Sequence, residues 1–217
     1  NRPISATVRE SMSIRSIALT LFALGAVVSP HATPYWIAWE GDDWPENQGW
    51  TRSYGTFNSP GGGQAERTLG DGTLYIDGMQ GIGVYDDYVL ELPGLLDPGP
   101  GEQFVAHWRM RVDELSAYPG WDPTVAFFAD DPWNVDFVYS YTHVWELATN
   151  RVVAIEPGVF HEYRLVSNNM RTFEFSVDGT LALIGNFDPG VLYSRAVWGD
   201  SFAPIESRST WDYVRFG

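Results

Sequence analysis

The chain has 217 residues, of which 44% are apolar and 15% are aromatic, and it contains no cysteine. These values indicate a folded domain with a sizeable core, and they exclude global disorder and disulfide or thiolate chemistry. The 28 acidic residues outnumber the 13 basic ones, all of them arginine, so the net charge is −15. Such a chain repels nucleic-acid phosphates and lacks the basic patch that binds an anionic membrane, so neither is predicted as a partner.

Residues 12–32 have the three-part layout of a secretory signal peptide. Arg15 lies in a short basic start, residues 17–28 form an apolar run, and Ser29 and Ala32 are the two candidate cleavage positions. The apolar run is too short to span a bilayer, so no membrane insertion is predicted once the signal is removed. A buried N-terminal helix is the alternative for the same residues.

Residues 1–11 precede this signal and show no apolar pattern, so we expect an unstructured upstream segment. Residues 33–217 show no linker and no repeat of fixed period, which predicts a single domain. The signal predicts export to the periplasm or the cell exterior, and the absence of cysteine in an exported domain fits a bacterial source.

The exported part shows short alternating runs bounded by Gly, Pro, Asp and Asn, with no sustained helical period. Many strands without intervening helices predict an all-β fold, with antiparallel pairing in a sandwich or barrel. Asp178-Gly179 is a strong hairpin signal between two of these strands. Strands are predicted over residues 73–77, 88–92, 104–112, 124–129, 135–147, 152–155, 160–167, 172–177, 181–186, 195–199 and 211–216.

Alternation assigns faces to the two longest predicted strands. In residues 104–112, the face with Trp108 is predicted to lie in the core, and the opposite face, with His107 and Arg109, is polar and suited to a groove. Residues 135–147 are predicted as one strand or as two strands with a bend. If they form one strand, a single face carries Phe137, Tyr139, Tyr141, His143 and Trp145. That row is either core or a stacking platform, and alternation alone leaves both readings open.

Three segments resemble a known superfamily. Residues 158–165 (GVFHEYRL) are similar to a G-x-W-H-x-Y-R-L strand in which Phe160 replaces Trp, and residues 173–179 (FEFSVDG) are similar to an x-L-Y-V-D-G hairpin. Residues 211–216 (WDYVRF) are similar to a closing D-Y-V-R strand. In this order they resemble the concanavalin A-like lectin/glucanase superfamily, particularly its laminin-G-like jelly rolls. The resemblance implies a two-sheet antiparallel sandwich with ligands on a concave sheet, and it leaves the function open.

The resemblance also implies a structural calcium ion. In related proteins, one ligand is the Asp of the closing strand, which corresponds to Asp212. Another is a backbone carbonyl from an early strand, which corresponds to Gly72. Calcium prefers such oxygen ligands. The alternative is that Asp212 only ends or caps a strand.

No catalytic motif is recognisable in the sequence. Family 16 glucanases of this superfamily carry alternating carboxylates on one strand, and this chain does not. The adjacent acids at 86–87, 113–114 and 130–131 point to opposite faces of a strand, and the first and third pairs are predicted to lie at turns. Nucleophile-elbow, zincin and phosphate-loop motifs are absent. We therefore do not predict an enzyme, and the sequence leaves open whether carboxylates from separate strands converge.

The leading hypothesis is a secreted carbohydrate-binding or adhesion module whose partner is a glycan, since sugar faces stack on aromatic rings while polar groups hold the hydroxyls. The alternatives are a polysaccharide-cleaving enzyme of the same fold, either a glycoside hydrolase or a lyase, and a non-catalytic structural surface or matrix domain. The candidate sugar-binding residues are Trp133, Tyr139, Tyr141 and Trp145 for stacking, with His107, Arg109, Asp130 and Asn134 as polar partners.

Overall fold

The computed structural model describes residues 37–56, 59–60, 64–78, 84–91, 98–115, 124–200 and 207–217. The chain divides into two compact units, and all of the described residues belong to the second, Thr33–Gly217. The predicted signal peptide and upstream segment therefore lie outside the described residues. Within the described ranges, no helix is long and apolar enough to cross a membrane.

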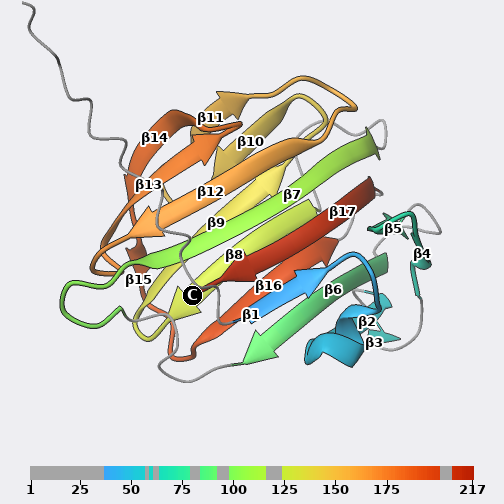
Figure 1. Cartoon of the computed structure of the whole chain (residues 1–217), viewed down its shortest axis with the longest axis horizontal. Helices are drawn as coiled ribbons and strands as arrows, with labels where there is room; N and C mark the ends of the chain where they lie inside the picture. The colour runs from blue at the N-terminus through green and yellow to red at the C-terminus, as the bar shows by residue number, and fades with distance from the viewer. Residues whose placement is uncertain are drawn as a thin grey trace, which may run out of the picture. The chain divides into compact units, whose positions relative to one another are not determined.

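The domain is an all-β sandwich of two antiparallel sheets, as predicted (Figure 1). Besides one 3-10 helix, η1 (Pro45–Gln48), its elements are β1 (Ile37–Glu40), β2 (Thr51–Thr56), β3 (Ser59–Pro60), β4 (Glu66–Gly70), β5 (Thr73–Asp77), β6 (Val84–Glu91), β7 (Phe104–Leu115), β8 (Thr124–Asp130), β9 (Trp133–Tyr139), β10 (His143–Glu146), β11 (Arg151–Ala154), β12 (His161–Ser167), β13 (Thr172–Val177), β14 (Thr180–Asn186), β15 (Asp188–Pro189), β16 (Arg195–Asp200) and β17 (Ser207–Phe216).

The two sheets differ in size and strand order. The eight-stranded sheet runs β14-β13-β12-β7-β17-β5-β4, with β1 also paired to β17. The nine-stranded sheet runs β11-β10-β9-β8-β16-β6-β2-β3, with β15 also paired to β9. Strands that are neighbours in a sheet are often distant in the sequence, as β7 and β17 are, so the pairing order depends on long-range contacts.

Aromatic rings fill the space between the two sheets. Phe137 of the nine-stranded sheet stacks on Phe175 of the eight-stranded sheet, with ring centroids 4.3 Å apart. Trp108, predicted to be a core residue, is buried and stacks on Tyr163 at 5.8 Å. Burying rings of this size removes a large apolar area from water, so they supply much of the cohesion between the sheets.

The Asp178-Gly179 hairpin joins β13 to β14, as predicted. Both residues have positive φ, 49° for Asp178 and 74° for Gly179, which a two-residue turn of this kind requires. The Asp178 carboxylate also lies 2.6 Å from Nδ1 of His161, at the start of β12. His161 is therefore a structural residue that ties the hairpin to the neighbouring strand.

Residues 135–147 form a hairpin rather than one continuous strand, which corrects part of the predicted facial pattern. The Ser140 side chain closes the turn between β9 and β10, because its Oγ accepts a hydrogen bond from the backbone N of His143 at 2.9 Å. The turn reverses the chain and changes the face on which odd-numbered residues lie. Phe137 and Tyr139 point into the core, whereas Trp145 pairs with Val138 on the outer face.

Asp86 and Asp87 lie inside β6 and not at the predicted turn, because β6 begins at Val84. As predicted for adjacent acids in a strand, they point to opposite faces. Asp86 is fully buried and accepts a hydrogen bond from Nε of Arg52 on the adjacent strand β2, at 2.8 Å. The paired guanidinium allows the carboxylate to be buried within the sheet.

A second buried acid, Asp200, lies directly opposite Asp86 on β16 and is only 1% exposed. Burial is the main cause that raises the pKa of Asp200 well above its usual range, and the carboxylates of Asp86, Asp87 and Asp77 raise it further. The hydrogen bond from Ser207 opposes this shift. Folding therefore favours the protonated form of Asp200.

This arrangement predicts the pH dependence of stability. The folded state holds the Asp200 proton above pH 4, where the unfolded chain has released it, so stability falls as the pH rises from the unfolded pKa towards the folded one. We expect Asp200→Asn to raise the melting temperature at pH 8 and to flatten this slope in thermal melts from pH 4 to pH 9. The exposed Asp42→Asn is the control. A variant less stable than the parent at pH 8 would contradict the assignment.

Candidate functional site

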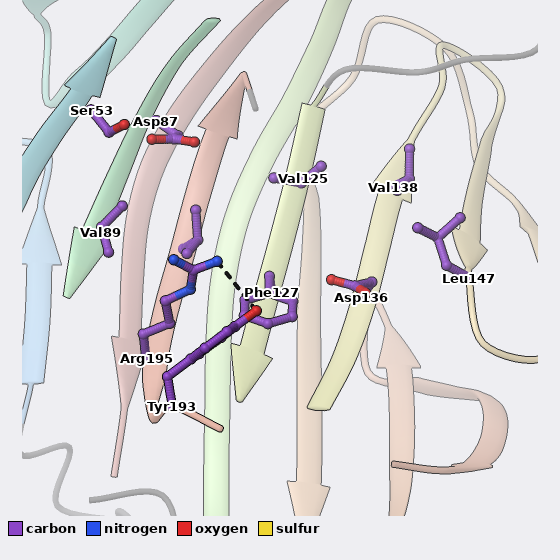
Figure 2. A pocket seen from close by; sticks show the side chains of 11 residues that line it. Ser53, Asp87, Val89, Val125, Phe127, Asp136, Val138, Leu147, Tyr193 and Arg195 are labelled. Atoms are coloured by element: carbon purple, nitrogen blue, oxygen red, sulfur yellow. Dashed lines mark hydrogen bonds between the residues drawn. The ribbon is translucent and has the colours of Figure 1, made fainter. Parts of the chain in front are cut away.

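A groove runs across the outer face of the nine-stranded sheet. Strand register places the outward residues in rows across the sheet, one of which reads Asp87, Gly199, Val125 and Val138 on β6, β16, β8 and β9. Figure 2 shows side chains of the groove on these neighbouring strands. The cavity of about 310 Å³ is lined by Ser53, Asp87, Val89, Val125, Phe127, Asp136, Val138, Leu147, Tyr193, Arg195 and Val197.

The floor of the groove is mostly aliphatic, and one position carries no side chain. Val125 and Val197 flank Gly199, which lies in the floor with a φ of +127°. A Cβ at this position would lie 2.7 Å from the backbone oxygen of Asp86, so the close approach of β6 requires glycine here. The backbone of β6 therefore fills the space that a side chain at this position would take.

One wall of the groove is a cluster of an arginine and two rings, whose centroids lie 6.2 Å apart. The guanidinium carbon of Arg195 lies 4.2 Å from the ring centroid of Tyr193 and 5.5 Å from that of Phe127. A long hydrogen bond of 3.4 Å joins Nη2 of Arg195 to the Tyr193 hydroxyl, drawn as the dashed line in Figure 2. Tyr193 remains 42% exposed. No carboxylate among the described residues forms an ion pair with Arg195.

A second cavity of about 540 Å³ continues the groove towards β2. It shares Ser53, Val89 and Arg195 with the first cavity. It is also lined by residues that follow η1 in the sequence and by further residues of β6. The combined groove crosses five strands, from β9 to β2, and Leu147, which directly follows β10, lines its end. An elongated ligand can therefore lie across the strands, with Arg195 between the two halves.

The first cavity carries two carboxyl groups, Asp87 and Asp136, which lie on well-separated strands. Burial raises the pKa of Asp136 to about 6, with a further contribution from Glu146, while Arg195 opposes the shift. Three strand spacings separate Asp136 on β9 from Asp87 on β6, or about 14 Å at about 4.8 Å per spacing. Glycosidase pairs lie roughly 5–9.5 Å apart. These two acids therefore do not form such a pair.

Comparison with solved structures identifies the fold. A carbohydrate esterase from the Shiga toxin-encoding bacteriophage phi24B superposes with a TM-score of 0.56 and 11% identity, covering 84% of this chain and 97% of that protein. A Bacillus licheniformis β-glucanase and a Lotus tetragonolobus seed lectin each give 0.50 and 12% identity, covering 83% of this chain and 97% of theirs. This chain has the concanavalin A-like lectin/glucanase fold. No protein-family model and no curated protein matches its sequence.

The concanavalin A-like fold separates two of the predicted sugar-binding residues from the others. His107 and Arg109 lie on β7, on the outer face of the eight-stranded sheet. Nε2 of His107 is 2.9 Å from a carboxylate oxygen of Glu162, and Arg109 forms an ion pair with Asp212. Neither residue shares a sheet with the groove, so the predicted set does not form one site.

Tyr139 is a core residue of the concanavalin A-like sandwich, which corrects its prediction as a sugar-stacking ring. Its side chain is fully buried, and its hydroxyl accepts a hydrogen bond of 2.9 Å from Nε1 of Trp108. Burial in this environment raises the pKa of the phenol well above its ordinary value. The ring is therefore inaccessible to a ligand.

The remaining predicted residues lie along the nine-stranded sheet. Asp130 is buried and accepts a hydrogen bond from Ser194, and the Asn134 side chain donates to the backbone of Asp188 at 2.9 Å. The ring of Trp133 stacks with an arginine side chain, and Tyr141 is exposed at the β9–β10 turn.

Trp145 is the predicted ring that adjoins the groove. It lies opposite Val138, a groove residue, and on its other side it pairs with the exposed Val152. Its role in binding stays a prediction.

Sequence reasoning missed the groove residues Asp87, Asp136, Tyr193 and Arg195. Trp198 faces inward, so alternation in residues 195–199 places Arg195 on the outer face of the same strand. This signal was present in the sequence. It does not show which outer face is hollowed, since that depends on how the strands pair.

The backbones of Gly72 and Asp212, the two residues predicted to bind calcium, both lie beside Gly41. The backbone N of Gly41 donates to the carbonyl of Asp212 at 3.0 Å, and a Cβ at Gly41 would overlap the carbonyl of Gly72. One carboxylate and nearby carbonyls are oxygen donors of the kind that calcium takes. The ion pair with Arg109 competes for the Asp212 carboxylate, and no cluster of three or more His, Cys, Asp or Glu in the described ranges is arranged to hold a metal.

The electrostatics of the groove can be tested by titration. We expect Asp136 to titrate with a midpoint near pH 6 in carboxyl-detected NMR. Arg195→Gln should raise this midpoint, because it removes the cation that favours the charged carboxylate. Arg171→Gln, whose guanidinium lies over Trp133, should leave it unchanged. A midpoint near pH 4 in the parent would refute the assignment.

Proposed function

We propose that this chain is a carbohydrate-binding module that holds a glycan in the groove of the nine-stranded sheet. The observation that carries the proposal is the wall formed by Tyr193, Arg195 and Phe127 above an apolar floor, with the carboxyl groups of Asp87 and Asp136 in the same groove. Sugars present apolar C–H faces and polar hydroxyls at once, and such a wall and floor complement both. The fold is shared with a lectin and a glucanase, which supports a carbohydrate ligand.

The elongated shape of the groove favours a chain of several sugar units over a single one. Trp145, opposite Val138, lies at the same end of the groove as Leu147 and offers a further stacking ring. The export signal predicted at residues 12–32 would bring the module to polysaccharides outside the cytoplasm.

Polysaccharide cleavage is the second candidate, and one observation favours it. Asp136 has a pKa of about 6, which suits a carboxyl group that donates a proton near neutral pH. The separation of Asp136 from Asp87 counts against a paired-carboxylate mechanism. Release of reducing ends from any bound glycan by the parent, and its loss in Asp136→Asn, would decide for the enzyme. A structural surface domain that binds no ligand is the remaining alternative.

The binding proposal predicts that removal of the exposed Tyr193 ring weakens glycan affinity. On a glycan array followed by calorimetry with the best ligand, we expect Tyr193→Ala to weaken affinity about fivefold to tenfold, because one stacking contact is lost. Phe160→Ala is the matched control. Phe160 also stacks with arginines, at 4.6 and 4.8 Å, but it contacts Arg109 and Arg111 of the eight-stranded sheet. Equal losses in both variants, or no array signal at all, would contradict the proposal.

We also propose that calcium binds where Gly72 and Asp212 meet, through the Asp212 carboxylate and backbone carbonyls. We expect calcium, but not magnesium, to raise the melting temperature by several degrees, because a ligand that binds only the folded state stabilises it. Asp212→Asn should abolish the shift, and Arg109→Gln should enlarge it by freeing the carboxylate. A melting temperature insensitive to both calcium and EDTA in the parent would exclude the site.

A further inference from the structure

We propose that the groove recognises a neutral sugar that carries an acetyl-sized acyl group, in preference to an unsubstituted or an acidic sugar. This inference rests on the proposed carbohydrate-binding function and names the ligand class within it. It follows from the chemistry of the floor, from the donors beside it and from the charge of the groove.

The floor is chemically unlike a surface for bare sugar hydroxyls. Val89, Val125, Val138 and Val197 offer branched methyl groups and no flat ring or hydrogen-bonding atom. A hydroxyl pressed onto them loses water without gaining a partner, which is unfavourable. A methyl group placed there instead buries apolar area on both sides.

The spacing of the valines limits the size of this group. Val197 of β16 lies directly opposite Val89 of β6, and Val125 of β8 lies directly opposite Val138 of β9. Side chains opposite each other on neighbouring strands have Cβ atoms about 5 Å apart. A small acyl group can be covered by one such pair, whereas a whole sugar ring with its hydroxyls is wider.

Arg195 provides donors for the acyl carbonyl. It lies on β16 two residues before Val197, and both side chains point to the outer face. No carboxylate among the described residues pairs with its guanidinium, which donates a long hydrogen bond to the Tyr193 hydroxyl. An N–H of Arg195 can therefore donate to an ester or amide oxygen while the attached methyl group packs on the valines.

The charge of the groove disfavours acidic sugars. Asp87, Asp136 and Glu91 line the combined groove, which also contains Arg195. The chain as a whole carries a net charge of −15. A uronate or sulfated sugar would be repelled on both counts, whereas an acyl group gives Arg195 an acceptor without adding charge.

Calorimetry with paired neutral ligands tests the inference. The first pair is an O-acetylated glucomannan oligosaccharide before and after mild alkaline deacetylation, and the second is N-acetylglucosamine oligomers against glucose oligomers of equal length. We expect at least a tenfold preference for the acetylated member of one or both pairs, since one methyl group in a fitted apolar site discriminates by about this factor. A preference in the first pair identifies the acyl group as an ester, and a preference in the second pair identifies it as an amide.

Substitutions of the floor valines test whether the preference for acetylated ligands arises in the groove. Val197→Thr keeps the side-chain shape and adds a hydroxyl, so it should reduce the preference about fivefold, and Val125→Thr should act in the same direction if one variant is unstable. Val166→Thr on β12 of the other sheet is the control and should leave the preference unchanged.

Equal affinity within both pairs, or preference for an acidic oligosaccharide, overturns the inference while leaving the binding function standing. No binding to any glycan on an array overturns both.

Discussion

The ring stack around Trp198 is the interaction on which the groove depends. Trp198 of β16 stacks on Tyr88 at 4.6 Å and on Trp39 at 4.8 Å, and it meets Trp211 of β17 at 4.9 Å. These rings come from both sheets, so they fix β16 against the opposite sheet. Because side chains alternate along a strand, an inward Trp198 forces Val197 and Gly199 onto the outer face. The floor of the groove is thus set by the packing of the core.

The two outer faces differ in how their arginines are used. On the eight-stranded sheet, arginines of β7 and β17 form ion pairs with nearby carboxylates, among them Arg109 with Asp212 and Arg215 with Glu40. On the nine-stranded sheet, Arg195 contacts two rings, and no described carboxylate forms an ion pair with it. Surface ion pairs contribute little stability but satisfy their donors. In the groove, the donors of Arg195 therefore remain for a ligand.

The sequence was sufficient for the fold and insufficient for the site, for physical reasons. Alternation and turn chemistry are local, so the burial of Trp108 and the Asp178-Gly179 hairpin were predictable. The faces of Tyr139 and Trp145 depend on whether the chain turns at Ser140, and a side-chain hydrogen bond decides this. The assignment of β7 to one sheet and β9 to the other depends on long-range pairing, which alternation does not encode.

The same pair of strands links the groove to the buried acids beneath it. On β6, Asp86 points inward and Asp87 outward, and on β16, Asp200 points inward directly after Gly199 in the floor. A side chain at 199 would push β16 away from the backbone of Asp86, and the same movement would disturb the buried contact between Asp86 and Asp200. Glycine at this position therefore serves two needs. It lets the backbones of β6 and β16 approach closely beneath the groove, and it allows two acids to be buried side by side in the core, one paired with arginine and the other with a raised pKa.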